Sequence, residues 1–292
     1  MRRPLYLSLL TILFLGAAVY LGCKQSSEQV NKEAAEDKAV MQETDSASGA
    51  QSDEPTVTIE VSKRSPAFPG AKARFANLKD GDVLDNNNVS VVVDVENYEL
   101  GVQTETERTE EIANSAKGQH AHIILDNEPY FADYQAGAQF DIGVLDKGAH
   151  TLVVFPSRSY HESVKSTDSV DIANFYVGEK EEGEFMLDKS KPTIIYSRPK
   201  GKYEGKDSEI IMLDFYAINI KPSDGYQAKY TIRKNEADAV EHTITMTKWS
   251  PAFVTGLSSG EYTVTLQLLD SDGNLVEGAF NNTQRSITVV TE

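Results

Sequence analysis

Apolar and polar side chains alternate with a period of two along many short segments of the chain. The clearest case is the segment 261–268, in which every second residue is apolar. Such alternation predicts a half-buried β-strand, and the polar segment 270–274 that follows predicts a hairpin turn. No segment has the length and period of an amphipathic helix. The pattern therefore predicts an all-β chain of short strands.

Three of the predicted strand segments recur in the same order later in the chain. Generic strands can match by coincidence, but three matches in the same order favour an internal duplication. About seven short strands in each copy, separated by polar, Gly-rich turns, predict two β-sandwiches in tandem. The matched pairs are 89–95 with 209–215, 119–125 with 226–232, and 145–152 with 257–264.

The segment Leu257–Tyr262 resembles the tyrosine corner of immunoglobulin-like and fibronectin-type domains, where a tyrosine near the start of strand F bonds to the preceding backbone. The resemblance implies that strand C lies beside strand F in each sandwich, and it gives Tyr262 a structural role. His150 occupies the equivalent position in the first copy, so we expect it to be structural as well. The implied strands C, F and G are 119–126, 149–155 and 168–177 in the first copy, and 226–232, 261–268 and 284–290 in the second.

The N-terminus carries a different pattern. A continuous apolar run, 5–22, follows Arg2 and Arg3 and ends before Cys23, the only cysteine of the chain. This arrangement resembles a bacterial lipoprotein signal, which implies removal of residues 1–22, acylation of Cys23 and attachment to a membrane by lipid. The alternative is an uncleaved N-terminal anchor, because the run has nearly the length of a spanning helix.

Residues 23–55 contain no aromatic side chain and are rich in Ser, Glu, Gln, Asp and Ala. Such a segment cannot bury enough apolar surface to offset its ordering entropy, so it is predicted to be a disordered linker. The two predicted immunoglobulin-like sandwiches then occupy 56–180 and 190–292. This organisation predicts a lipid-anchored protein of the cell envelope, at the outer membrane or the cell surface.

The chain is acidic, with a formal net charge of −17. This charge argues against nucleic acid as a partner, because binding to phosphates requires a basic surface. The lack of a second cysteine excludes disulfides and thiolate chemistry within the domains. The sequence has neither a phosphate-binding Gly-rich loop nor a His-Glu-x-x-His motif. We therefore expect a protein that is not an enzyme.

Four of the five histidines fall in the first copy. His120 and His122 are two residues apart on predicted strand C, so both side chains point to the same face. The second copy has Gln227 and Lys229 at these positions, which indicates that the scaffold does not require histidine there. The pair is either part of a functional site or a pair of solvent-facing polar residues.

His161 lies in the predicted F–G loop, which shares one end of the sandwich with the loop that precedes His120. The two histidines of strand C and His161 are therefore predicted to converge, with Glu162 or an acid from the segment 105–111 beside them. Imidazole together with carboxylate suits zinc or copper(II). The sequence therefore predicts a metal site formed by His120, His122, His161 and Glu162.

The segments 118–126 and 148–152, followed by His161, are similar to an uncharacterised family of small secreted bacterial β-domains. That family carries a histidine pair before an apolar strand and a later strand with the pattern Gly-x-His-Thr-Leu. The resemblance implies export and a β-sandwich. It implies no activity.

Ile124, Val153 and Phe155 are predicted to point outward on the histidine face. An outward apolar patch marks an interface, unless the segment 57–61 pairs as an extra strand and covers it; both interpretations remain open.

Together these features predict a membrane-tethered lipoprotein with a non-enzymatic binding role, with zinc or copper bound by the first sandwich. Two alternatives remain. One is an adhesion or assembly module that recognises a protein or a glycan through its loops, and the other is a structural spacer. Exposed aromatic platforms at Tyr98, Tyr160 and Trp249 would favour a glycan.

Overall fold

The computed structural model describes residues 56–62, 65–166, 168–181 and 183–292, which are joined by contacts into one unit. The predicted signal peptide, the acylation site Cys23 and the linker 23–55 lie outside the described residues. Within the described part of the chain, no helix is long and apolar enough to cross a membrane.

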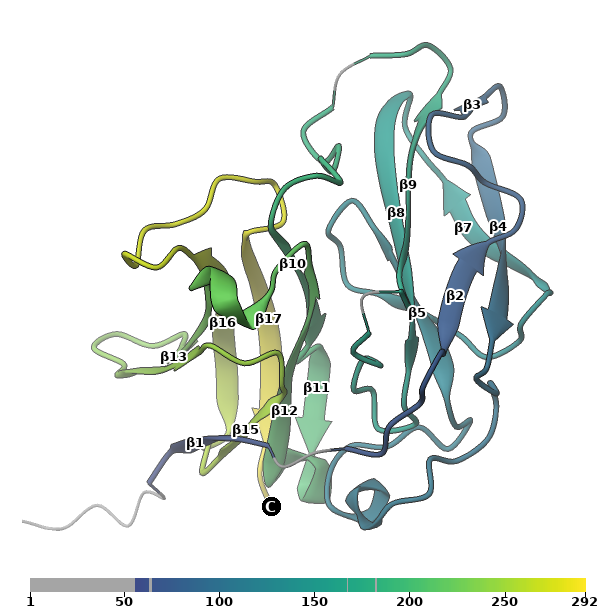
Figure 1. Cartoon of the computed structure of the whole chain (residues 1–292). Coiled ribbons are helices and arrows are strands. Elements are labelled where there is room, and N and C mark those ends of the chain that lie inside the picture. Colours follow the sequence, from purple (N-terminus) through teal and green to yellow (C-terminus); the bar gives the residue numbers. More distant parts are fainter. Residues whose placement is uncertain (1–55, 63–64, 167, 182) are drawn as a thin grey trace, which may run out of the picture. The chain divides into compact units, whose positions relative to one another are not determined.

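The first sandwich packs a three-stranded sheet, in the order β2-β4-β7, against a five-stranded sheet, in the order β3-β9-β8-β5-β6 (Figure 1). Alternate residues of both sheets meet in one buried apolar cluster, as the period-two pattern requires. The strands are β2 (Lys72–Phe75), β3 (Val83–Leu84), β4 (Asn88–Glu96), β5 (His120–Leu125), β6 (Phe131–Asp133), β7 (Gln139–Val144), β8 (Gly148–Ser157) and β9 (Asp171–Val177).

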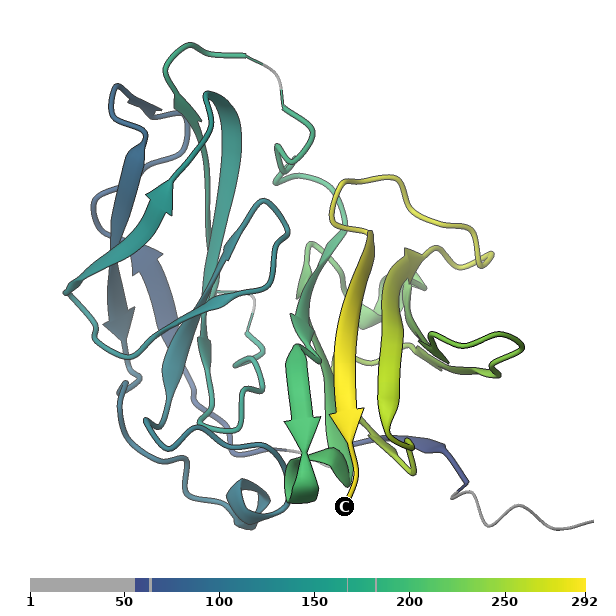
Figure 2. The same cartoon turned by 180° about the vertical axis from the view of Figure 1, so that it is seen from behind.

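The second sandwich has a four-stranded sheet, in the order β1-β15-β12-β10, and a five-stranded sheet, in the order β11-β17-β16-β13-β14. Figure 2 shows β16 and β17 side by side, as their pairing requires. The strands are β1 (Thr58–Val61), β10 (Thr193–Arg198), β11 (Gly201–Glu204), β12 (Ile210–Ile218), β13 (Gln227–Lys234), β14 (Glu241–Met246), β15 (Ala252–Thr255), β16 (Gly260–Leu269) and β17 (Asn282–Val290). In the described ranges, three short 3-10 helices, η1 (Glu107–Glu110), η2 (Gly205–Ser208) and η3 (Pro222–Asp224), lie in loops.

The prediction of an all-β fold with two immunoglobulin-like sandwiches is confirmed. Predicted strands C and F correspond to β5 and β8 in the first sandwich and to β13 and β16 in the second, and in each sandwich the two strands are paired.

The two corner residues make equivalent contacts. The hydroxyl of Tyr262 donates to the carbonyl of Ser258 at 2.9 Å, and Nε2 of His150 lies 3.0 Å from the carbonyl of Asp146. In both cases the partner is four residues earlier in the chain. His150 has a second contact, because its Nδ1 lies 2.6 Å from a carboxylate oxygen of Asp126.

Strand β1 differs from the expectation for the segment 57–61. It pairs antiparallel with β15 of the second sandwich, with Thr58 opposite Thr255, and Ile59 packs against the second core. It therefore does not cover the outward patch of the first sandwich, and the predicted first domain wrongly includes it. Alternation identifies a strand but not the sheet edge that the strand joins. The independent folding of 56–180 and 190–292 stays a prediction.

The outward patch of Ile124, Val153 and Phe155 is buried against the second sandwich. The ring of Phe155 stacks on that of Tyr216, with centroids 4.8 Å apart and planes inclined by 24°. The patch is therefore an interface, and its partner is part of the same chain. The other buried members of this cluster from the second sandwich are Ile195, Ile218 and Phe280.

Candidate metal site

His120 and His122 lie on the outward face of β5, as the period of the strand requires. Ala121 and Ile123 point the other way into the core of the first sandwich. Both imidazoles are fully buried. The alternative that the pair faces solvent is therefore wrong. The second sandwich covers the pair, and its Ser197 hydroxyl lies 3.2 Å from His122 Nδ1.

His161 reaches the pair from a tight turn after β8. The amide of His161 donates to the carbonyl of Arg158 at 2.8 Å, and Ser157 bridges Ser163 on the return. The turn holds His161 at φ +70°, a conformation uncommon for residues other than glycine. Strained backbone of this kind clusters at functional sites, so this conformation agrees with a site at His161.

The structure brings three imidazole nitrogens together. His120 Nε2 lies 3.1 Å from His122 Nε2 and 3.1 Å from His161 Nδ1. One ligand atom from each of the three residues lies within 4.8 Å of the others. Two nitrogens bound to one tetrahedral zinc at 2.0–2.1 Å are separated by about 3.4 Å. The three donors therefore need only small movements to share one metal ion.

The opposite ring nitrogens have partners that orient the imidazoles. His120 Nδ1 lies 2.9 Å from the carbonyl of Gly118, which accepts only, so Nδ1 carries the proton and Nε2 of the neutral ring keeps its lone pair. His122 Nδ1 faces the hydroxyl of Ser197. Metal-binding histidines commonly donate their distal N–H to such oxygens. Both rings can thus present Nε2 lone pairs to the same point.

Burial keeps the cluster neutral. It lowers the pKa of His120 to about 4 and holds the pKa values of His122 and His161 well below the usual range. The nearby cations Arg198 and Lys200 lower all three pKa values further. Near neutral pH the imidazoles are therefore unprotonated, which is the form that binds metal ions.

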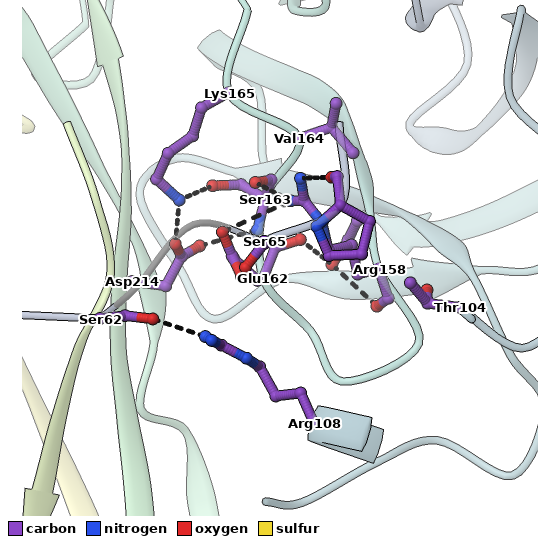
Figure 3. A network of polar contacts seen from close by, with 12 residues as sticks. Ser62, Ser65, Thr104, Arg108, Arg158, Glu162, Ser163, Val164, Lys165 and Asp214 are labelled. Carbon is purple, nitrogen blue, oxygen red and sulfur yellow. Dashed lines mark hydrogen bonds and ion pairs between the residues drawn. The ribbon is translucent and has the colours of Figure 1, made fainter. Parts of the chain in front are cut away.

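Glu162 does not join the histidines. Its carboxylate lies 3.5 Å from Arg158 Nη1 and accepts a hydrogen bond from Ser65, as Figure 3 shows. The turn that aims His161 at β5 sends the next side chain elsewhere, where it neutralises a buried arginine that would otherwise be costly. The acids of the segment 105–111 are likewise outside the histidine group. The carboxylate part of the predicted ligand set therefore has no support among the described residues.

Polar contacts tie the loop that carries His161 to the second sandwich. Asp214 of β12 is fully buried, accepts a hydrogen bond from the amide of Ser163 at 3.0 Å and pairs with Lys165 (Figure 3). Because Lys165 and Ser163 lie on either side of Val164 in this loop, the contacts restrain the loop close to His161. The position of His161 therefore depends on both sandwiches.

Tyr130 lies against the histidines, although no sequence pattern singles it out. Its ring stacks on His122, with centroids 3.5 Å apart and planes inclined by 13°, and its hydroxyl lies 3.2 Å from His161 Nδ1. Lys200 Nζ lies 4.0 Å from the centre of the Tyr130 ring, and the Arg198 guanidinium lies 5.8 Å from it. No local pattern marks the residues of β10 and the turn after it as neighbours, because they arrive through packing of the two sandwiches.

The three aromatic residues considered as a glycan platform are not exposed. The hydroxyl of Tyr98 donates to the carbonyl of Ser157 at 2.9 Å, and Tyr160 is only 1% exposed. Trp249 is half-buried, and its indole N–H donates to the carbonyl of Phe215. The observation that would have favoured a glycan is therefore missing at these residues.

A Gly-x-Ser-x-Gly spacing occurs at Gly256–Gly260, a pattern that in some hydrolases places the serine on a strand-to-helix turn. Here Ser258 lies in the turn between strands β15 and β16. Its hydroxyl lies 3.3 Å from that of Tyr262, so it belongs to the tyrosine corner. The local fold is therefore not the nucleophile elbow of those enzymes.

No family model matches the chain, and no curated protein matches it. Among solved structures, the chain is similar to fibronectin(III)-like modules of CbhA from Clostridium thermocellum (12% identity over 75% of this chain and 94% of that one, TM-score 0.25). It is also similar to latent PorU from Porphyromonas gingivalis (13%, 82% of this chain, 21% of that one, TM-score 0.25). A third is the central fibronectin-III array of RIM-binding protein (13%, 74% and 71%, TM-score 0.23). No function is carried over from similarities this distant.

Proposed function

We propose that this chain is a membrane-tethered lipoprotein with a non-enzymatic role, and that it binds zinc or copper(II) through His120, His122 and His161. The observation that supports the metal site is the convergence of three ring nitrogens from β5 and the following loop within 4.8 Å. The lipid tether rests on Cys23 and the apolar run before it.

The ring-nitrogen lone pairs of the cluster also favour a metal. His120 Nε2 is an acceptor, and two further ring nitrogens lie 3.1 Å from it. A cation between the lone pairs removes their repulsion. The competing arrangement is a hydrogen-bond chain, in which Ser197 donates to His122 and His122 donates to His120. A structural spacer would need only these hydrogen bonds and would bind no metal.

The metal site is tested by titrating the full chain, purified in detergent, with zinc and with copper(II). We expect one ion to bind per chain with a dissociation constant that is micromolar or lower. The melting temperature should rise with metal, because an ion that binds only the folded state stabilises it. His122→Ala should abolish both effects.

Two other histidines serve as matched controls. His242→Ala on β14 should leave binding unchanged, because His242 lies outside the cluster. His150→Ala should lower the melting temperature without changing metal affinity, because its contacts are to Asp126 and Asp146. Absence of binding to the unaltered chain would reject the metal proposal.

The lipid tether is tested by Cys23→Ser. Acylation adds about 0.8 kcal/mol of membrane affinity for each buried methylene, so its loss should move the protein from the membrane fraction to the soluble fraction, or leave an unprocessed precursor. Mass spectrometry and membrane fractionation measure both outcomes. A variant with unchanged mass and unchanged partition would contradict the lipoprotein assignment.

A further inference from the structure

The histidine cluster contains a fourth polar atom that has not been assigned a role. The hydroxyl of Tyr130 lies 3.2 Å from His161 Nδ1, while His161 Nδ1 and His122 Nε2 each lie 3.1 Å from His120 Nε2. These separations are close to the roughly 3.4 Å between donors of one tetrahedral ion. Tyr130 is 4% exposed, and its ring is fixed by stacking on His122, so the hydroxyl is held in place.

We infer that Tyr130 supplies the fourth donor of the metal site, as a phenolate oxygen. The inference rests on the proposed metal site. When the ion binds, the phenol O–H bond breaks, the proton passes to solvent, and the oxygen lone pair coordinates the ion.

The charges around the cluster favour an anionic donor. Three neutral imidazoles leave the full charge of a divalent ion uncompensated, and the buried guanidinium of Arg198 and the ammonium of Lys200 add to it. No carboxylate of the described residues belongs to the histidine group. A phenolate reduces the net charge of the ion and its ligands by one. Burial raises the pKa of the Tyr130 hydroxyl to about 12, and the charges of Arg198 and of the bound ion oppose that rise.

A second tyrosine beside the cluster provides a matched control. The ring of Tyr134 lies 4.9 Å from that of His120, but its hydroxyl lies 2.8 Å from the hydroxyl of Ser115. Both tyrosine rings thus lie against a histidine of the cluster, but only the Tyr130 hydroxyl is in contact with a histidine nitrogen.

The test compares copper(II) binding by the full chain in detergent with binding by Tyr130→Phe and Tyr134→Phe. Affinity is measured by chelator competition, and the visible spectrum reports phenolate-to-copper charge transfer. We expect the charge-transfer band in the unaltered chain and in Tyr134→Phe. In Tyr130→Phe the band should disappear and the affinity should fall by at least about tenfold.

Phenylalanine keeps the ring that stacks on His122, and the melting temperature without metal checks that each variant is folded. Unchanged affinity and an unchanged spectrum in Tyr130→Phe would overturn the role of Tyr130 and leave the three-histidine site intact. Absence of copper binding by the unaltered chain would overturn both proposals.

Discussion

Histidine residues in this chain have opposite environments, and the direction of each pKa shift follows from them. The hydrogen bond to Asp126 raises the pKa of His150, whereas burial lowers the pKa of His120 to about 4. A histidine with a lowered pKa stabilises the fold above the unfolded value of about 6.5, and this stability is lost as the pH falls toward the folded value. The buried cluster should therefore make the protein sensitive to acid.

We predict that the free energy of unfolding without metal falls between pH 6.5 and pH 4. In this window the unfolded chain binds protons that the folded cluster does not, and His120 alone would account for roughly 3 kcal/mol. Denaturant unfolding at several pH values measures the slope. His120→Gln should flatten the slope, and His242→Ala should not; an equal slope in His120→Gln would contradict the assignment.

Much of the residue-level site was predictable from β5. A period of two fixes the face of His120 and His122, and the sandwich topology brings the loop with His161 to the same end. Glu162 was not predictable, because the φ of the preceding residue decides where its side chain points. The contact with Ser197 was also not predictable, since Ser197 lies on the other sandwich and no local sequence pattern marks it.

At the scale of elements, the loop before β5 positions His120 through Gly118. Gly118 has φ +86°, and an added Cβ would lie 2.5 Å from the carbonyl oxygen of Val102. The carbonyl of Gly118 also contacts the ring of His120. A side chain at this position would therefore displace the atom that fixes the imidazole.

We predict that Gly118→Ala lowers both metal affinity and stability, the latter by about 1–3 kcal/mol. Gly137→Ala is the matched control, because Gly137 also has a positive φ but no atom within 4 Å of its added Cβ. Thermal unfolding and metal titration of both variants measure the effects. Equal losses in the two variants would show that backbone strain alone, and not the contact at Val102, is responsible.

Strand positions were predictable from the sequence, whereas some strand partners were not. Alternation placed β13 and β16 within a few residues, and the resemblance to immunoglobulin-like domains paired them correctly, because strands C and F are neighbours in that topology. The same alternation identified β1 as a strand but could not identify β15 as its neighbour, since the two lie at opposite ends of the sequence. Long-range pairing depends on packing that a local pattern does not contain.

For the whole molecule, each sandwich has its own core, and a third apolar cluster joins the two. We predict that residues 56–180 and 190–292 expressed separately both give all-β circular dichroism. Each fragment should unfold at a lower temperature than the full chain. The stacking contact between Phe155 and Tyr216 is lost in both fragments, and the second fragment also lacks β1.

The interface can also be weakened within the full chain. Phe155→Ala should lower the free energy of unfolding by about 3–5 kcal/mol, as expected for removal of a fully buried aromatic ring. Denaturant unfolding measures this loss. Helical circular dichroism from either fragment would contradict the fold, and fragments as stable as the full chain would contradict the role of the interface.

The pairing of β1 with β15 also has a consequence for the order of events during biosynthesis. Thr58 leaves the ribosome long before its partner Thr255. Strand β1 therefore remains unpaired while the whole first sandwich and most of the second are synthesised. A nascent chain that stops before β15 retains β1 as a free, aggregation-prone edge. The pairing of β1 thus depends on synthesis of the second sandwich as far as β15.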